Sequence, residues 1–122
     1  MTITNEDNIK LMSRYEDNHF DLAIVDPPYG IGFDGEVPTM ANNNSKKWDN
    51  AKGTGYKKKE WDTTRPNKEY FEELKRVSKN QIVWGGNYFT DMLPVTGGWI
   101  VWEKGVPDNM SLSQAELAYN ST

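Results

Sequence analysis

The tetrapeptide Asp26-Pro27-Pro28-Tyr29 is the stretch of this chain whose residue types could do chemistry. Proline fixes its own φ angle and restricts the residue before it, so the backbone here is stiff. Because proline has no N–H, this backbone offers carbonyl acceptors, and the Asp26 carboxylate adds further acceptor oxygens. With the Tyr29 ring beside them, these acceptors suit a planar ligand that carries an amino group: the oxygens accept from its N–H bonds, and the ring stacks on its face.

The alternative for the tetrapeptide is a purely structural role, in which two prolines end a strand and Tyr29 joins the core. At a proline frequency of about 5 %, this order of four residues arises by chance on the order of once per thousand or more chains of this length. It also follows directly on an apolar run at 22–25. Since ligands of open α/β sheets bind beyond the carboxyl ends of the strands, we favour a ligand-binding role.

The tetrapeptide after an apolar strand resembles the catalytic motif of S-adenosylmethionine-dependent amino-group DNA methyltransferases, which modify adenine N6 or cytosine N4. The segments "NKEYFEELKRVSKNQIVWGGNYF", "GWIVWEKG" and "AELAYNS" are similar to those that follow the motif in bacterial and phage-type adenine methyltransferases, so the resemblance covers nearly the whole chain. Asp rather than Ser at the first motif position favours adenine over cytosine N4. The resemblance therefore implies a DNA adenine-N6 methyltransferase of the restriction-modification kind, with S-adenosyl-L-methionine as cofactor and DNA as partner.

The resemblance assigns catalysis to Asp26, Pro27, Pro28 and Tyr29. The exocyclic amine of adenine is a poor nucleophile because its lone pair is delocalised into the ring. Hydrogen bonds from this amine to the Asp26 carboxylate and the Pro27 carbonyl would localise the lone pair toward the methyl donor. Tyr29 would stack on the base after the base has flipped out of the duplex. The sulfonium supplies the electrophile, so no metal is expected.

Cofactor binding is implied at Asp26 and at Asp7, a position where the family places an acid near S-adenosylmethionine. A helix cap is an equal alternative for Asp7, because Asn5, Asp7 or Asn8 could each cap a helix carrying the apolar residues that follow. The family's glycine-rich cofactor loop has no counterpart. Residues 30–35 contain glycines, but they follow the motif and lack the strand–loop–helix setting.

The position of the motif in the chain also resembles one arrangement of the family. The chain starts about 20 residues before the motif and stops where a cofactor half would begin. We expect an N-terminal catalytic half, and the alternative function is a non-catalytic module that binds a partner chain or nucleic acid. Without strands from a missing half or a second chain, residues 22–25 would form an exposed apolar edge open to self-association.

Charge is distributed unevenly along the chain. The net charge is −4 at pH 7, but residues 44–65 carry seven basic and three acidic residues, so this segment is +4 and the rest is −8. Beside a predicted DNA-modifying site, lysines in this segment are expected to contact phosphates, against the alternative of an ordinary solvated loop. The DNA-binding candidates are Lys46, Lys47, Lys57, Lys58 and Lys59.

The hydrophobic pattern predicts the elements that position these residues. The unbroken apolar run at 22–25 is typical of a strand buried on both faces. A helix is predicted to start at Pro66 or Asn67 and to bury apolar residues at helical spacing, namely Tyr70, Phe71, Leu74 and Val77. Strands are predicted within 81–86, 98–105 and 115–121. Strand, crossover helix, strand is typical of a parallel sheet, so we expect the α/β class, as a partial Rossmann-like methyltransferase sheet without its cofactor half.

The remaining features bound the organisation of the chain. Its 122 residues suit one domain, residues 1–122, interrupted by a long loop at about 31–65 that is a functional lid, a binding loop or disordered. The absence of cysteine excludes disulfides, thiolate metal sites and cysteine nucleophiles. No apolar run approaches the roughly 20 residues of a membrane helix, so a soluble, cytoplasmic protein is expected. The tryptophans Trp84, Trp99 and Trp102 are expected to be core or packing residues rather than base-stacking platforms.

Two further positions are considered as functional candidates, the glycines at 85–86 and His19. The glycines of "WGGN", at 84–87, either let the backbone approach a ligand or form a plain turn, with equal weight on each. His19 lies in a polar turn and is expected to have no catalytic role.

Overall fold

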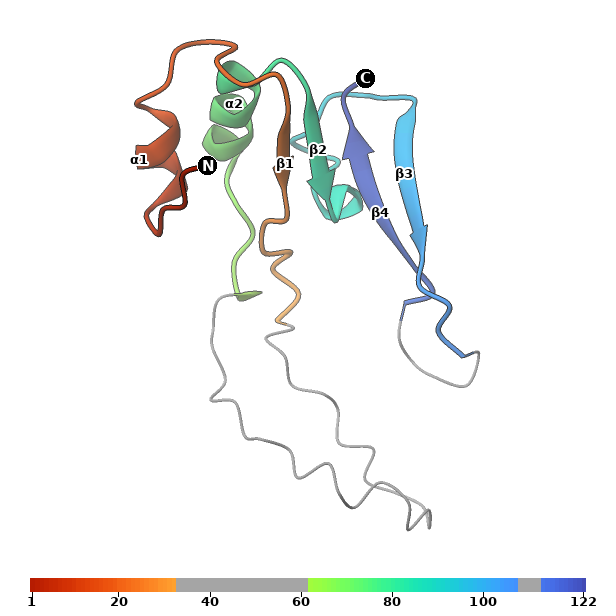
Figure 1. The fold of residues 1–122 in the computed structure, drawn as a ribbon. Helices are drawn as coiled ribbons and strands as arrows, with labels where there is room; N and C mark the ends of the chain where they lie inside the picture. Colours follow the sequence, from red (N-terminus) through yellow and green to blue (C-terminus); the bar gives the residue numbers. More distant parts are fainter. Residues whose placement is uncertain (33–61, 108–112) are drawn as a thin grey trace. The chain divides into compact units, whose positions relative to one another are not determined.

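A computed structural model describes residues 1–32, 62–107 and 113–122 of the chain (Figure 1). These residues belong to two compact units. The first consists of Met1–Pro27 and Pro66–Thr122, and the second is Pro28–Arg65. The first unit contains all the helices and strands that the structure describes. Within the described ranges, no helix has the length and apolar character needed to cross a membrane.

The first unit is built on a four-stranded sheet. The strands are β1 (Ala23–Val25), β2 (Gln81–Trp84), β3 (Gly98–Glu103) and β4 (Ala115–Asn120), and their order in the sheet is β1-β2-β4-β3 (Figure 1). β1 and β2 run parallel, whereas β4 is antiparallel to both β2 and β3. The predicted α/β class is confirmed, and so is the parallel pair of strands on either side of the crossover helix, but the sheet as a whole is mixed rather than parallel. Residues 104–114 are too few for the crossover that a parallel return requires, so β4 comes back antiparallel beside β3.

Helix α2 (Lys68–Val77) makes the crossover between β1 and β2. Its first turn is capped by Asn67, whose side chain accepts a hydrogen bond from the Tyr70 N–H at 3.1 Å. The four apolar residues predicted to be buried along this helix are all buried: Tyr70, Phe71, Leu74 and Val77. The helix is therefore the element that sequence periodicity predicts best.

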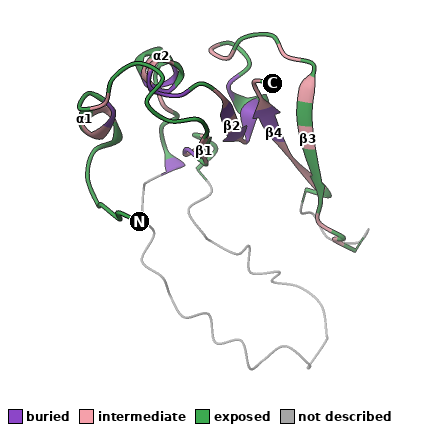
Figure 2. Ribbon diagram, turned by 45° about the horizontal axis from the view of Figure 1, so that its top comes forward, coloured by how far each residue is buried: buried purple, intermediate pink, exposed green. Residues whose placement is uncertain are grey.

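The core lies on one face of the sheet. Cross-strand partners project from the same face, and the register aligns Val25 with Val83 and Val83 with Tyr119. Val83 is 0 % exposed, and Tyr119 is also buried. The ring of Phe89, which follows β2, is fully buried and lies 5.2 Å from the ring centroid of Phe71 on α2. Figure 2 shows the same pattern, with buried residues concentrated in β2, β4 and α2.

The opposite face of the sheet carries exposed apolar side chains in the described structure. Ile24, which pairs with Ile82, is 61 % exposed, and Trp102 on β3 is 53 % exposed. The Trp102 ring meets Trp84 edge-on at 6.2 Å. The prediction that residues 22–25 are buried on both faces is therefore wrong. The tryptophans do pack against other rings, since Trp99 also meets the Tyr119 ring with 6.2 Å between centroids, but Trp99 and Trp102 stay exposed and are not core residues. β1 does lie at the edge of the described sheet, as expected.

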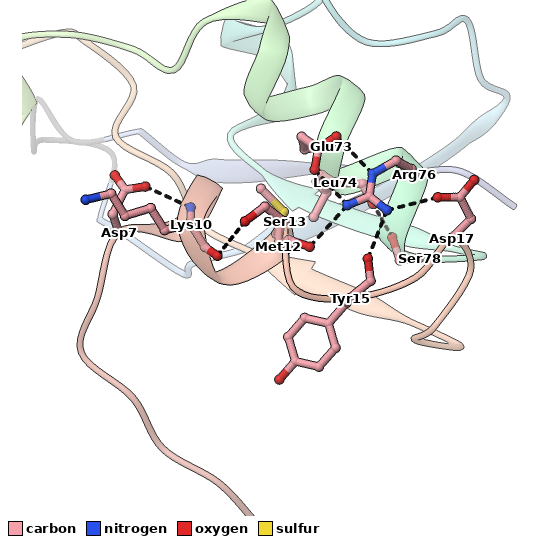
Figure 3. A network of polar contacts seen from close by, with 10 residues as sticks. All are labelled: Asp7, Lys10, Met12, Ser13, Tyr15, Asp17, Glu73, Leu74, Arg76 and Ser78. Carbon is pink, nitrogen blue, oxygen red and sulfur yellow. Dashed lines mark hydrogen bonds and ion pairs between the residues drawn. The ribbon is translucent and has the colours of Figure 1, made fainter.

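A short helix, α1 (Asn8–Met12), precedes the sheet, and Arg76 of α2 holds the chain that follows it (Figure 3). Arg76 donates to the backbone oxygens of Met12 at 3.1 Å and Tyr15 at 2.9 Å. It also pairs with Asp17 at 2.9 Å and with Glu73 at 2.8 Å. These bonds satisfy backbone carbonyls at and just after the C-terminal end of α1, where the helix itself provides no N–H partner.

Candidate functional site

Asp26 and Pro27 follow directly on β1, at the carboxyl end of the strand. Asp26 is exposed, whereas Pro27 is buried. Since β1 and β2 are parallel, their carboxyl ends lie at the same end of the sheet, and residues 85–87 follow β2 at that end. The first half of the tetrapeptide thus lies where open α/β sheets bind ligands. The Asp26 carboxylate and the proline backbone carry acceptor oxygens at this position.

The glycines after β2 form a turn that packs against β4. Gly85 has a φ of +65°, in the left-handed region, and its N–H donates to the Leu117 carbonyl at 2.9 Å. A Cβ on Gly86 would lie 2.6 Å from the Cβ of Tyr119, closer than two carbon atoms can approach. The turn therefore accounts for both glycines, so the plain turn predicted for "WGGN" is present, and approach of its backbone to a ligand stays a prediction. His19, predicted to have no catalytic role, packs its ring against the ring of Tyr15, with 4.7 Å between the ring centroids.

The second half of the tetrapeptide, Pro28 and Tyr29, belongs to the second unit, where both are half-buried. The chain turns directly after Tyr29, because Gly30 has a φ of +72°. Gly30 donates its N–H to the Asp62 carboxylate at 2.8 Å, and Gly32 donates to the Asp62 carbonyl oxygen at 2.9 Å. Asp62 is 2 % exposed. The turn that carries Tyr29 is thus bonded to a buried acid far along the chain.

Sequence reasoning did not single out Asp62. It counted this residue only as one of three acids in a basic segment, and the glycines at 30 and 32 indicate a turn without indicating its partner. No local pattern links residues 30 and 62, so only the folded structure identifies the pair.

The other predicted ligand-binding residues fall in two groups. Asp7 accepts a hydrogen bond from the Lys10 N–H at 3.0 Å and is the N-cap of α1 (Figure 3). The cap predicted for this residue is therefore present, and its role toward a cofactor stays a prediction. The DNA-binding candidates lie outside the described residues; they are Lys46, Lys47, Lys57, Lys58 and Lys59.

A cavity of about 470 Å³ lies in the first unit between α2, the sheet and residues 92–95. Its apolar lining includes Phe71, Leu74 and Met92, and neither Asp26 nor Pro27 lines it. The hydroxyl of Ser78 on its wall already donates to the Leu74 carbonyl at 2.6 Å. The cavity is also lined by the core-face residues Val83 and Tyr119, so it is distinct from the strand end that carries Asp26 and Pro27.

Comparison of the chain with protein-family models, with curated proteins and with solved structures finds no match. In the part of the chain that the structure describes, no three His, Asp or Glu side chains come together in a way that could hold a metal ion.

Proposed function

We propose that this chain is the catalytic part of a DNA adenine-N6 methyltransferase that uses S-adenosyl-L-methionine, built on part of a Rossmann-like sheet. The observation that carries the proposal is the position of Asp26 and Pro27. They lie at the carboxyl end of β1, beside the end of the parallel strand β2. This is the location at which open α/β sheets bind ligands, and the resemblance of the tetrapeptide supplies the reaction.

The proposed work of Asp26 and Pro27 is to bind and orient the amino group of the target base. Two N–H donors of adenine N6 would bond to the Asp26 carboxylate and the Pro27 carbonyl. The burial of Pro27, and the restriction that the following Pro28 places on the ψ angle of Pro27, limit reorientation of this carbonyl. Acceptors that are already in place stabilise the positive charge that develops on nitrogen without a reorganisation cost.

The proposed work of Tyr29 is to stack on the base once it has left the duplex. The hydrogen-bonded turn at Gly30 and Asp62 limits the motion of the backbone that carries this ring. The lysines between residues 46 and 59 would contact phosphates, which positions DNA without reading its sequence.

S-Adenosyl-L-methionine, when bound, supplies an electrophilic methyl group and carries positive charge on its sulfonium and amino groups. The exposed Asp26 carboxylate fits the cationic end of this cofactor. Asp7 is the second candidate for cofactor binding, although its side chain already caps α1.

Methyl transfer from labelled S-adenosyl-L-methionine to DNA of mixed sequence tests the proposal. Digestion and mass spectrometry of the nucleosides distinguish N6-methyladenine from N4-methylcytosine. Asp26→Ala should abolish incorporation, and Asp21→Ala is a matched control because Asp21 is an exposed acid on the other side of β1 in sequence. Surviving turnover in Asp26→Ala would remove Asp26 from the mechanism. Calorimetric titration without detectable cofactor binding would reject independent catalysis by this chain.

A second candidate function, association without catalysis, is favoured by the open apolar face and the edge position of β1. Two β1 edges can pair antiparallel about a twofold axis, using the same residues of two copies of this chain. Light scattering during size-exclusion chromatography should show a dimer. Ile24→Lys should shift it toward monomer, whereas Thr2→Lys, at an exposed residue outside the sheet, should not. A wild-type monomer at tens of micromolar would reject this candidate.

A further inference from the structure

The turn after Tyr29 is hydrogen-bonded to Asp62, an acid at the far end of a long stretch of chain. The Asp62 carboxylate accepts from the Gly30 N–H at 2.8 Å, and its backbone oxygen accepts from the Gly32 N–H at 2.9 Å. All three residues belong to the second unit. One residue therefore accepts from two N–H groups of the turn, those of Gly30 and Gly32, and links the segments that begin and end this unit.

The burial of Asp62 indicates that this contact is a built feature of the unit. Its exposed fraction is 2 %. A carboxylate removed from water is costly unless hydrogen bonds replace its hydration, so aspartate is rarely this buried without dedicated donors. The Gly30 N–H is such a donor, and a bond from an N–H to a charged carboxylate is stronger than one to a neutral acceptor.

We propose that Asp62 is a positioning residue for Tyr29, an inference that rests on the stacking role of Tyr29 in the proposed function. The N–H of Gly30 and the carbonyl of Tyr29 belong to one planar peptide unit. When the Asp62 carboxylate holds that N–H, it sets the orientation of the whole peptide plane and so restricts the ψ angle of Tyr29. The backbone that carries the Tyr29 ring is then ordered before a base arrives, so only the side-chain torsions remain to be ordered on binding.

The close approach of Gly30 to residue 65 adds a second restraint. A Cβ on Gly30 would lie 2.9 Å from the Arg65 backbone nitrogen and 3.3 Å from the Arg65 Cβ. With its φ of +72°, this position favours glycine on both counts. The peptide after Tyr29 is thus bonded to Asp62 and packed against residue 65, so it has little room to rotate.

Two readouts test the inference on the full chain. Tyrosine rings labelled with ¹³C report the Tyr29 environment by NMR, with Tyr29→Phe for assignment. Fluorescence anisotropy of a labelled single-stranded oligodeoxyadenylate reports base binding. Asp62→Ala should shift or broaden the Tyr29 ring signal and weaken oligonucleotide binding about tenfold, the loss expected for one hydrogen bond to a charged group. Asp62→Asn, which keeps an oxygen for the Gly30 N–H, should restore both.

Controls separate positioning from general stability. Glu72→Ala removes an exposed acid of α2 and should change neither readout. In a Tyr29→Ala background, Asp62→Ala should produce no further loss of binding, since it acts through that ring. If Asp62→Ala fails to fold by circular dichroism, Asp62→Ser takes its place, because its shorter side chain cannot span the same distance to the Gly30 N–H.

The outcomes distinguish the two proposals. An unchanged Tyr29 ring signal in a folded Asp62 variant overturns the positioning role, and so does an equal further loss of binding in the Tyr29→Ala background. If Tyr29→Ala binds oligodeoxyadenylate as the wild type does, the stacking role in the proposed function fails instead. The ring signal still decides whether Asp62 orients Tyr29 in that case.

Discussion

Two substitutions on neighbouring strands test the assignment of a covered face and an open face to the sheet. Val83 on β2 is 0 % exposed, whereas Ile24 on β1 projects from the opposite face and is 61 % exposed. Val83→Ala and Ile24→Ala both shorten an aliphatic side chain in the sheet. The sheet geometry predicts that they differ in their effect on the free energy of unfolding.

The burial of each side chain sets the size of the effect. Val83→Ala removes two fully buried carbons, about 1.6 kcal/mol at roughly 0.8 kcal/mol each, and the cavity left behind raises the cost to about 2–3 kcal/mol. Ile24→Ala removes three carbons, but most of this side chain is already in water. Its cost should therefore be about 1 kcal/mol or less.

Urea unfolding followed by circular dichroism measures both values. With a slope of about 1–3 kcal/mol per molar urea, the two midpoints should differ by roughly 1 M. The assignment of the two faces is refuted if Ile24→Ala lowers the free energy of unfolding as much as Val83→Ala does, measured at the lowest usable protein concentration. A cost of Ile24→Ala that grows with protein concentration would instead indicate that a second copy covers this residue.

Three further predictions concern the helices. Asp7→Ala should lower the unfolding free energy by about 1 kcal/mol, because it removes the cap of α1. Asp7→Asn should keep the cap and the stability. If calorimetry shows that Asp7→Asn binds S-adenosylmethionine more weakly than the wild type, Asp7 contacts the cofactor. Burial raises the pKa of Tyr70 from 10.0 to about 12, so its stabilising contribution is complete below pH 10 and is lost as the pH rises through 12. Tyr70→Phe should therefore remove this alkaline loss, and an unchanged unfolding profile by tryptophan fluorescence would contradict it. The hydrogen bond from the Arg76 guanidinium holds the pKa of Glu73 below 4.5, so the pair stabilises the fold above pH 4.5 and less as the pH falls through the folded-state pKa. Arg76→Met should be less stable than wild type at pH 7, and the difference should narrow on acidification; a constant difference in urea titrations across pH 3–7 would contradict this account.

The sequence determined the local elements of this protein. The helical spacing of apolar residues in α2 and the apolar, β-branched run of β2 each contain their signal within a few neighbouring residues. The strands β3 and β4 were predicted within a residue or two for the same reason. The location of Asp26 at the end of β1 also followed, because an apolar strand that runs into two prolines has to stop there.

The sheet pattern and the support of the candidate site were decided by tertiary structure. The apolar run at 22–25 looks the same whether one face or two are covered, so the exposure of Ile24 depends on which elements pack on β1. The antiparallel direction of β4 depends on its two neighbours in the sheet. The contact between Gly30 and Asp62 joins residues 32 positions apart. Backbone preferences and hydrophobic period act over a few residues, whereas strand direction, face coverage and such a hydrogen bond arise only when distant segments pack together.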